Sequence, residues 1–210
     1  TLFRSSYMKY GATYVDGRSQ ALSNAFVARF EELGGEVHFG RGVRSIRTEG
    51  GRVAGVETDD GEMYEASRVV SNADPVTTCR SLLGDGAYPV EWLQHMGISR
   101  PAAGTINVYM GLDRAPGDVG LTTHENFINP DDDHDAIWEG TRRLEPPRAV
   151  LATLYNHVWP AISPPGTSIV VLTALSYGAP WVSLPPARYY DTKMRLAETM
   201  IATAERHAPG

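Results

Sequence analysis

Few stretches of this chain have residue types and spacing that could do chemistry. Residues 40–45 read Gly-Arg-Gly-Val-Arg-Ser and begin like the glycine-rich loop that binds a dinucleotide pyrophosphate. That loop needs a third glycine and a following helix, because the helix N-terminus binds the phosphates. Here Ser45 takes the place of the glycine and a strand pattern follows. We therefore do not expect a pyrophosphate loop at this position.

Acidic and histidine side chains gather between residues 124 and 135, where they could in principle hold a metal ion. Their spacing matches no known ligand pattern, and the glycine of an EF-hand loop is missing. We therefore expect a solvated acidic loop and assign no metal site. The candidate donors are His124, Glu125, Asp131, Asp132, Asp133, His134 and Asp135.

No catalytic nucleophile or acid–base pair stands out, so the catalytic residues remain unassigned. The chain has no Gly-x-Ser-x-Gly elbow. Cys79 lies in a helical pattern without an activating neighbour, and we expect it to be a packing residue. If the protein is an enzyme, a cofactor must carry the chemistry.

Composition narrows the class of protein. The 210 residues are 42% hydrophobic and 21% charged, which is typical of one large or two small globular domains. The net charge of −6, without a basic patch interleaved with aromatics, argues against nucleic acid as a main partner.

Sequence signals of location are weak. No stretch approaches the ~18 apolar residues of a membrane span, and we find no signal peptide. The one cysteine cannot form an internal disulfide. These features predict a cytoplasmic protein. The chain starts without methionine and stops just after a helical pattern, so we expect a piece of a longer protein.

The first 75 residues are predicted to form one helix and a β-meander. Residues 19–33 carry leucine and phenylalanine on one face of a 3.6-residue period, and two glycines follow. A short strand is expected at residues 36–39. Further strands are expected at residues 43–47, 52–58, 62–66 and 67–71, with glycine turns between the first three of these.

The remaining residues are predicted to form strands and helices around an acidic loop. Asp74 and Pro75 indicate a helix start, and a second short helix is expected at residues 89–96. Strands are expected at residues 104–112, 148–158 and 167–176, an irregular polar segment at 113–147, and a closing helix that begins at Pro185 and Pro186. Its apolar period is carried by Tyr190, Met194, Ala197, Ile201 and Ala204. The fold class is therefore α+β.

The ordered set of motifs resembles the phytoene-desaturase-related branch of the flavin-dependent oxidoreductases, the wider group that includes the amine oxidases. The motifs are a Gly-Arg-Ser loop, a helix ending in Gly-Gly-Glu-Val, the meander, Val-Val-Ser-Asn-Ala-Asp-Pro, Ser-Pro-Pro-Gly and a last helix ending in Pro-Gly. The resemblance implies that residues 1–75 are part of a Rossmann-like FAD-binding domain, α/β in the parent enzyme. It implies that residues 76–210 are a substrate-binding domain of mostly antiparallel sheet covered by helices.

The resemblance also implies cofactor-binding residues. In the family, the strand beginning at Val43 contacts the adenine edge of FAD through its backbone amide and carbonyl groups. Ser71, Asn72 and Ala73 lie near the adenosine–pyrophosphate side of the cofactor. Small residues at such a strand end let a ligand approach the backbone. The alternatives are a core strand residue for Val43 and a simple turn before the helix for Ser71 and Asn72. The family's main pyrophosphate loop is not among these residues.

By the same resemblance, the loop at residues 16–20 lies near the flavin and the substrate, which makes Arg18 and Gln20 substrate-proximal. The family has a second glycine where Arg18 stands. Its guanidinium could bind an acidic or polar substrate, or it could face solvent or form a structural ion pair.

The resemblance implies a fragment of an FAD-dependent oxidoreductase that passes hydride from a lipophilic substrate to flavin, in desaturation or isomerisation. We expect this chain alone to be inactive. Two alternatives stay open: a flavin amine oxidase-like enzyme, and a non-catalytic binding or structural module. A lipophilic substrate would make peripheral membrane contact reasonable. The sequence leaves the oligomeric state undetermined.

Overall fold

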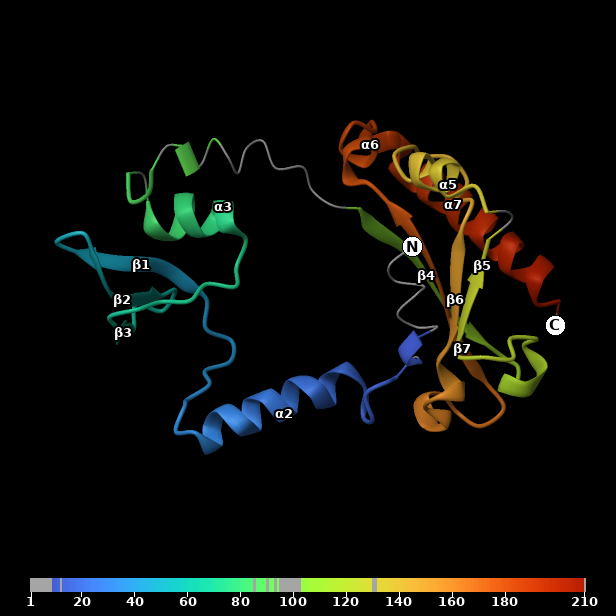
Figure 1. Cartoon of the computed structure of the whole chain (residues 1–210), viewed down its shortest axis with the longest axis horizontal. Helices are drawn as coiled ribbons and strands as arrows, with labels where there is room; N and C mark the ends of the chain where they lie inside the picture. The colour runs from blue at the N-terminus through green and yellow to red at the C-terminus, as the bar shows by residue number, and fades with distance from the viewer. Residues whose placement is uncertain are drawn as a thin grey trace. The chain divides into compact units, whose positions relative to one another are not determined.

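The computed structural model describes residues 9–11, 13–84, 86–89, 91–92, 94, 103–129 and 132–209. The chain divides into two compact units, residues 1–100 and 101–210. The elements of each unit are labelled in Figure 1. The predicted boundary at residue 75, which separates a cofactor-binding part from a substrate-binding part, concerns function and stays a prediction.

The first unit contains the predicted amphipathic helix, α2 (Arg18–Glu32). It ends where the sequence indicates, at Leu33 and a left-handed Gly34 with φ 87°. The described residues do not bury its apolar face, because Phe26 and Leu33 are each 70% exposed. The 3.6-residue period therefore predicts the helix correctly, but it says nothing of what packs on it.

The β-meander forms as predicted from its turns. Strands β1 (Val43–Glu49), β2 (Arg52–Thr58) and β3 (Met63–Glu65) pair antiparallel in the order β1-β2-β3. Gly50 and Gly51 both have positive φ, as a two-residue hairpin turn between paired Glu49 and Arg52 requires. Gly55 has a second role, because a Cβ there would overlap the carbonyl oxygen of Tyr64 on β3.

Two predicted strands are wrong. Residues 36–39 and 67–71 form no strand, although the first has a β-type pattern and the second contains Val69 and Val70. A strand needs a neighbour to satisfy its backbone hydrogen bonds, and the described residues pair none with either segment. The side chain of Val70 is accordingly 97% exposed.

The predicted helix start at Asp74 is confirmed. The Asp74 carboxylate accepts a 2.8 Å hydrogen bond from the Thr77 amide, and this bond holds the pKa of Asp74 below its usual range. The segment α3 (Pro75–Thr77) continues as a π-helical turn, η1 (Thr78–Leu83). Of the helix predicted at residues 89–96, residues 91, 92 and 94 are helical, while residues 90, 93, 95 and 96 lie outside the described residues.

The second unit is built on a four-stranded antiparallel sheet, which confirms the α+β class. Its strands are β4 (Gly104–Leu112), β5 (Glu125–Ile128), β6 (Val150–Leu154) and β7 (Ser168–Ser176), in the order β4-β7-β6-β5. Short helical turns join them: η2 (Pro116–Asp118), η3 (Tyr155–His157) and η4 (Pro160–Ile162).

The segment predicted to be irregular, residues 113–147, contains β5 and a helix, α5 (His134–Gly140). Asp133 begins α5 by accepting a 2.9 Å hydrogen bond from the Ala136 amide. A strand of four residues has too short a pattern to be recognised alone, and β5 obtains its order from pairing with β6.

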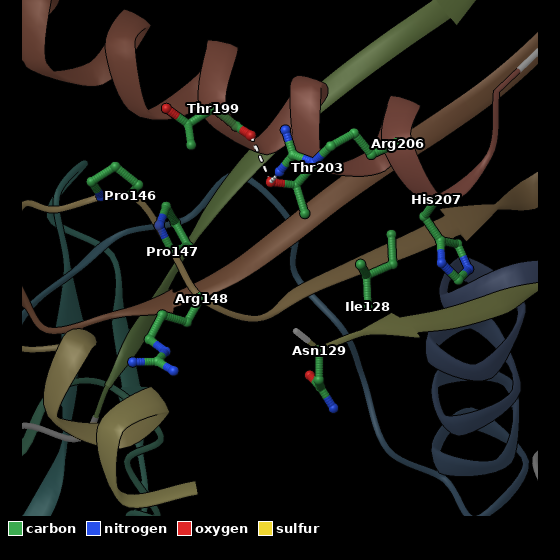
Figure 2. A pocket seen from close by; sticks show the side chains of 9 residues that line it. All are labelled: Ile128, Asn129, Pro146, Pro147, Arg148, Thr199, Thr203, Arg206 and His207. Carbon is green, nitrogen blue, oxygen red and sulfur yellow. Dashed lines mark hydrogen bonds between the residues drawn. The ribbon is translucent and has the colours of Figure 1, made fainter. Parts of the chain in front are cut away.

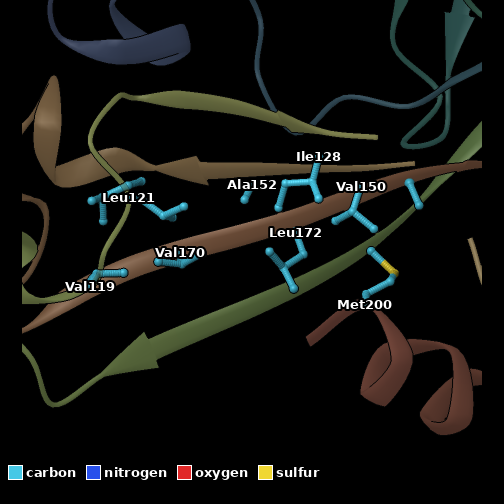
Figure 3. Close-up of a cluster of buried hydrophobic side chains, with 10 residues drawn as sticks. Val119, Leu121, Ile128, Val150, Ala152, Val170, Leu172 and Met200 are labelled. Atoms are coloured by element: carbon cyan, nitrogen blue, oxygen red, sulfur yellow. The ribbon is translucent and has the colours of Figure 1, made fainter. Parts of the chain in front are cut away.

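The last two helices are α6 (Gly178–Val182) and α7 (Pro186–His207). Helix α7 packs on the sheet through Thr192, Leu196 and Met200, of which Met200 lies close to the strand residues in Figure 3. The predicted apolar face is therefore partly wrong, because Tyr190 and Met194 are 74% and 53% exposed. The buried cluster comprises Val119, Leu121, Ile128, Val150, Ala152, Leu154, Val170, Leu172, Ala174 and Met200.

Candidate functional site

The four-stranded sheet has two unlike faces. Because side chains alternate along a strand, the face that bears Leu172 and Ala174 is the one packed in the buried cluster with α7. The other face, called the second face here, is lined by the alternate residues of all four strands. Its residues are Thr105, Asn107, Tyr109, Glu125, Phe127, Leu151, Thr153, Val171, Thr173 and Leu175.

The strand register sets the second face out in rows. One row is Tyr109, Val171, Thr153 and Glu125, since each residue pairs with the next across the sheet. The rims of this face carry large exposed apolar side chains. Tyr109 is 75% exposed, and Phe127 and Leu175 are each 50% exposed.

Half of the ten residues of this face are polar, and several of them form hydrogen bonds or ion pairs. The Thr173 hydroxyl donates a 2.8 Å hydrogen bond to Asn107 Oδ1, and Asn107 Nδ2 donates to the Thr105 hydroxyl at 3.1 Å. At the start of β5, the edge strand opposite β4, His124 Nε2 lies 3.5 Å from a carboxylate oxygen of Glu125. Small-molecule sites combine apolar surface with fixed polar groups, and this face carries both kinds of residue in equal number.

Val43 is the first residue of β1, an edge strand of the three-stranded sheet. Half of the backbone N–H and C=O groups of an edge strand point away from its neighbour, which suits the predicted contact with an adenine edge. A register shift lies between Val43 and Ser45, and the Val43 side chain is 40% exposed.

The turn before Val43 is tied down by hydrogen bonds and ion pairs. The Asp59 amide donates to the Gly42 carbonyl at 2.9 Å. Arg41 forms ion pairs with Asp60 and Glu62, and the charge of Asp60, followed by that of Glu62, raises the pKa of Arg41. A hydrogen bond from the Thr58 hydroxyl holds the pKa of Asp60 below its usual range. These contacts hold the start of β1 in place.

Residues 40–42 connect to a strand rather than a helix, since β1 follows them directly. The helix that a pyrophosphate loop requires is therefore not formed here.

Ser71, Asn72 and Ala73 are small or polar residues exposed on the surface of the first unit. The Ser71 and Thr78 hydroxyl oxygens lie 2.8 Å apart, and the Ala73 amide donates to Ser71 Oγ at 3.3 Å. Since β1 packs against η1, which contains Thr78, the structure brings the Val43 strand and the Ser71 turn into one small unit. The cofactor-binding role of these residues stays a prediction.

Arg18 and Gln20 lie at the start of α2, which has no extensive packing contact with β1 or η1 among the described residues. Gln20 Nε2 donates a 2.8 Å hydrogen bond to Asn24 one turn along the helix. Arg18 has φ 70°, the one positive value among the described non-glycine residues. Glycine adopts this backbone conformation most readily, so the positive φ of Arg18 is compatible with the glycine that the resemblance implies at this position, which stays a prediction.

We expect Arg18→Gly to raise the free energy of unfolding by about 1 kcal/mol, because relief of left-handed strain exceeds the added flexibility of the unfolded chain. Arg18→Val is the control, and it should lower the same quantity by about 1 kcal/mol because β-branched residues tolerate positive φ least. Urea unfolding followed by far-ultraviolet circular dichroism measures both. Equal effects of the two substitutions would show that backbone strain does not decide the outcome.

The candidate metal-ligating residues and Cys79 lie in a helix start, on the exposed surface or in the protein interior. Asp133 caps α5, while His134 and Asp135 lie exposed in its first turn. Among the residues that the structure describes, no group of three or more His, Cys, Asp or Glu side chains could hold a metal ion. Asp131 lies outside those residues. Cys79 is buried in η1, as expected of a packing residue.

Comparison with known proteins identifies the family. Residues 2–208 match the family described as flavin containing amine oxidoreductase, and the chain belongs to that family. It is therefore a member of a flavin-containing oxidoreductase family, and its relatives include carotenoid desaturases and an isomerase.

Two curated relatives and one solved structure illustrate the similarity. The chain is 30% identical over 168 residues to a lycopene-forming phytoene desaturase of Paracoccus sp., covering 75% of this chain and 31% of the relative. It is 24% identical to the chloroplastic prolycopene isomerase of Arabidopsis thaliana over 198 residues, or 93% and 32% of the two chains. An oxidoreductase from Methanosarcina mazei shares the fold, with TM-score 0.61 and 21% identity over 92% of this chain and 40% of that one.

The chain thus spans about a third of the length of these two curated relatives. Within the described residues, no helix is both long enough and apolar enough to cross a bilayer.

The sequence analysis missed the second face as a candidate site. The strands were predicted, but an apolar run buried on both sides has no alternation that distinguishes its faces. The alternation of polar and apolar residues in β4 is the one available signal, and it places Tyr109 opposite the face that packs on α7.

Proposed function

We propose that this chain is part of an FAD-dependent oxidoreductase that acts on a lipophilic small molecule, in desaturation or isomerisation. The single observation that carries the proposal is the second face of the sheet, where Tyr109, Phe127 and Leu175 expose large apolar surface. Membership of a flavin-containing family and relatives named for carotenoid chemistry support it.

Each part of the proposed enzyme has its own task. When bound, the flavin accepts a hydride from a substrate carbon. The second face would hold the substrate by apolar contact and exclude water, while Asn107 and Thr173 would orient any polar end. No side chain is assigned as an acid or a base. Residues 1–75 would contribute to FAD binding, and the pyrophosphate loop would lie in sequence outside this chain.

The adenine contact is proposed to use the backbone of β1 near Val43, with Ser71, Asn72 and Ala73 near the adenosine–pyrophosphate part. Because the backbone would do the binding, a β-forming side chain is all that the position needs. A lipophilic substrate is stored in membranes, so peripheral membrane contact is part of the proposal.

We expect Val43→Pro to weaken FAD binding by about tenfold, because proline removes the backbone N–H and with it one hydrogen bond. Proline is tolerated at the first residue of an edge strand, so the meander should still fold. Val43→Thr is the matched control and should bind FAD like the wild type. Flavin retained by the purified complete gene product, released by heat and measured by fluorescence, gives the result. Normal FAD content in Val43→Pro would contradict the backbone contact.

A further inference from the structure

One carboxylate lies on the second face of the four-stranded sheet. Glu125 is the first residue of β5 and ends the row that begins at Tyr109 on β4. Of the ten residues of that face, all of which the structure describes, Glu125 alone carries a carboxyl group. The hydroxyl and amide groups of the others accept a proton poorly at neutral pH. Glu125 is therefore the residue of the second face best suited to accept one.

Two neighbours hold the Glu125 carboxylate in place. His124 Nε2 lies 3.5 Å from Oε1. The Thr153 hydroxyl, on the paired strand β6, donates a 3.4 Å hydrogen bond to Oε2. The side chains of His124 and Glu125 are 17% and 36% exposed. The carboxylate thus lies at the rim of the second face, in contact both with that face and with solvent.

The imidazole ring of His124 is fixed in turn. Its Nδ1 lies 3.1 Å from the Leu154 carbonyl oxygen, and because a carbonyl oxygen only accepts, Nδ1 must be the donor. The ring of Tyr155 packs edge-on against it, with 5.6 Å between the ring centroids. With Nδ1 as the donor, the contact between Nε2 and the Glu125 carboxylate is favourable only when a proton lies between them. His124 and Glu125 therefore form a pair that shares a proton.

The proposed desaturation must dispose of a proton. It breaks C–H bonds at two neighbouring carbons. One hydrogen leaves as a hydride, and takes the electron pair of its bond to the flavin. The other leaves as a proton, and the electron pair of its bond forms the new C=C bond. That proton needs an acceptor within hydrogen-bond reach of the substrate.

The hollow beside the last turns of α7 does not supply this acceptor. Figure 2 shows that Ile128 and residues of α7, among them Thr203 and His207, line it. Ile128 belongs to the buried cluster on the side of the sheet that α7 covers. Side chains of this hollow therefore lie across the sheet from a substrate on the second face.

We propose that Glu125 is the base of the desaturation. Glu125 Oε2 forms an O–H bond with the proton that leaves the substrate carbon. His124 and Thr153 are positioning residues that orient the carboxylate. The proton then passes to water, since the pair is partly exposed at the rim. This inference rests on the proposed function and adds to it the residue that carries the proton.

The test is a single anaerobic turnover of the flavin-loaded complete gene product with a lipophilic polyene, followed by the absorbance of the lengthened polyene that forms. Glu125→Gln keeps the shape of the side chain and should slow product formation about 100-fold, the lower end of the contribution of a general base. Glu125→Asp keeps a carboxylate and should retain part of the rate. Glu139→Gln is the matched control, because it removes the carboxylate of another ion pair, 3.2 Å from Arg142, and it should react like the wild type.

Two further measurements distinguish a base from a residue that supports the fold. Glu125→Gln should leave polyene affinity unchanged, as measured by tryptophan quenching on the flavin-free protein. Deuterium at the carbon that loses the proton should slow Glu125→Gln more than the wild type, because proton removal then limits the rate. Circular dichroism establishes that each variant is folded, and Glu125→Asp with its isotope effect decides if Glu125→Gln is not.

The possible results separate this inference from the proposed function. Product formation at the wild-type rate in Glu125→Gln would overturn the inference and leave the proposed function standing. An equal loss in Glu139→Gln, a parallel loss of polyene affinity or an unchanged isotope effect would also overturn it, since each indicates a general or structural effect. A wild type that neither bleaches its flavin nor forms the product would contradict the proposed function, and this inference with it.

Discussion

Leu172→Ala is expected to lower the free energy of unfolding of the second unit by about 2–5 kcal/mol. Leu172 is fully buried in the cluster between the sheet and α7, and truncation would leave a cavity that its neighbours cannot fill. Urea unfolding monitored by circular dichroism measures the change.

Leu175→Ala is the matched control for this effect. It lies three residues along the same strand, but on the second face and 50% exposed. We expect it to cost about 1 kcal/mol or less, because half of the side chain is already in water. Similar losses for the two alanine variants would mean that the faces of the sheet have been assigned wrongly.

Leu175→Asp is expected to weaken binding of a lipophilic polyene about 10- to 100-fold. The substrate would lose the apolar contact of one leucine and would have to desolvate a carboxylate. Stability should change little, since the position is half exposed. Quenching of tryptophan fluorescence on the complete gene product would report the affinity.

Met194→Asp controls for the charge itself. Met194 is 53% exposed, close to the value for Leu175, but it lies on α7. The same substitution there should leave polyene affinity unchanged. If Met194→Asp weakens binding as much as Leu175→Asp, the second face is not the substrate surface.

Local sequence signals predicted the elements of this fold well. Gly50 and Gly51 fix the meander turn through positive φ, and Asp74 caps the helix that Pro75 starts. Such features depend on neighbours in sequence, so they can be read from the chain. The α+β class follows from them.

Features that depend on distant partners could not be predicted in the same way. Residues 67–71 have a strand pattern, but no described strand pairs with them, and Val70 is 97% exposed. Strand β5 was missed for the converse reason, since pairing with β6 orders four residues of mixed character. The buried face of α7 also depends on the sheet, which selects Leu196 and Met200 over Tyr190 and Met194.

The candidate site also contains residues that the sequence suggested and residues that only the structure brings together. The resemblance to a flavoprotein family supplied Val43, Ser71, Asn72, Ala73, Arg18 and Gln20, and their roles stay predictions. The positive φ of Arg18 is a structural fact that its identity alone does not reveal. The second face could be recognised only from the strand register, because its residues come from four strands that are far apart in the sequence.

The most direct test of the proposed function is an anaerobic mixing experiment with the flavin-loaded complete gene product. We predict that a lipophilic polyene bleaches the visible absorbance of the flavin, and that Leu175→Asp requires far more polyene for the same bleaching while Met194→Asp does not. Bleaching by a hydrophilic amine and not by the polyene would contradict the proposal and favour an amine oxidase activity. A complete gene product that binds no flavin would contradict it outright.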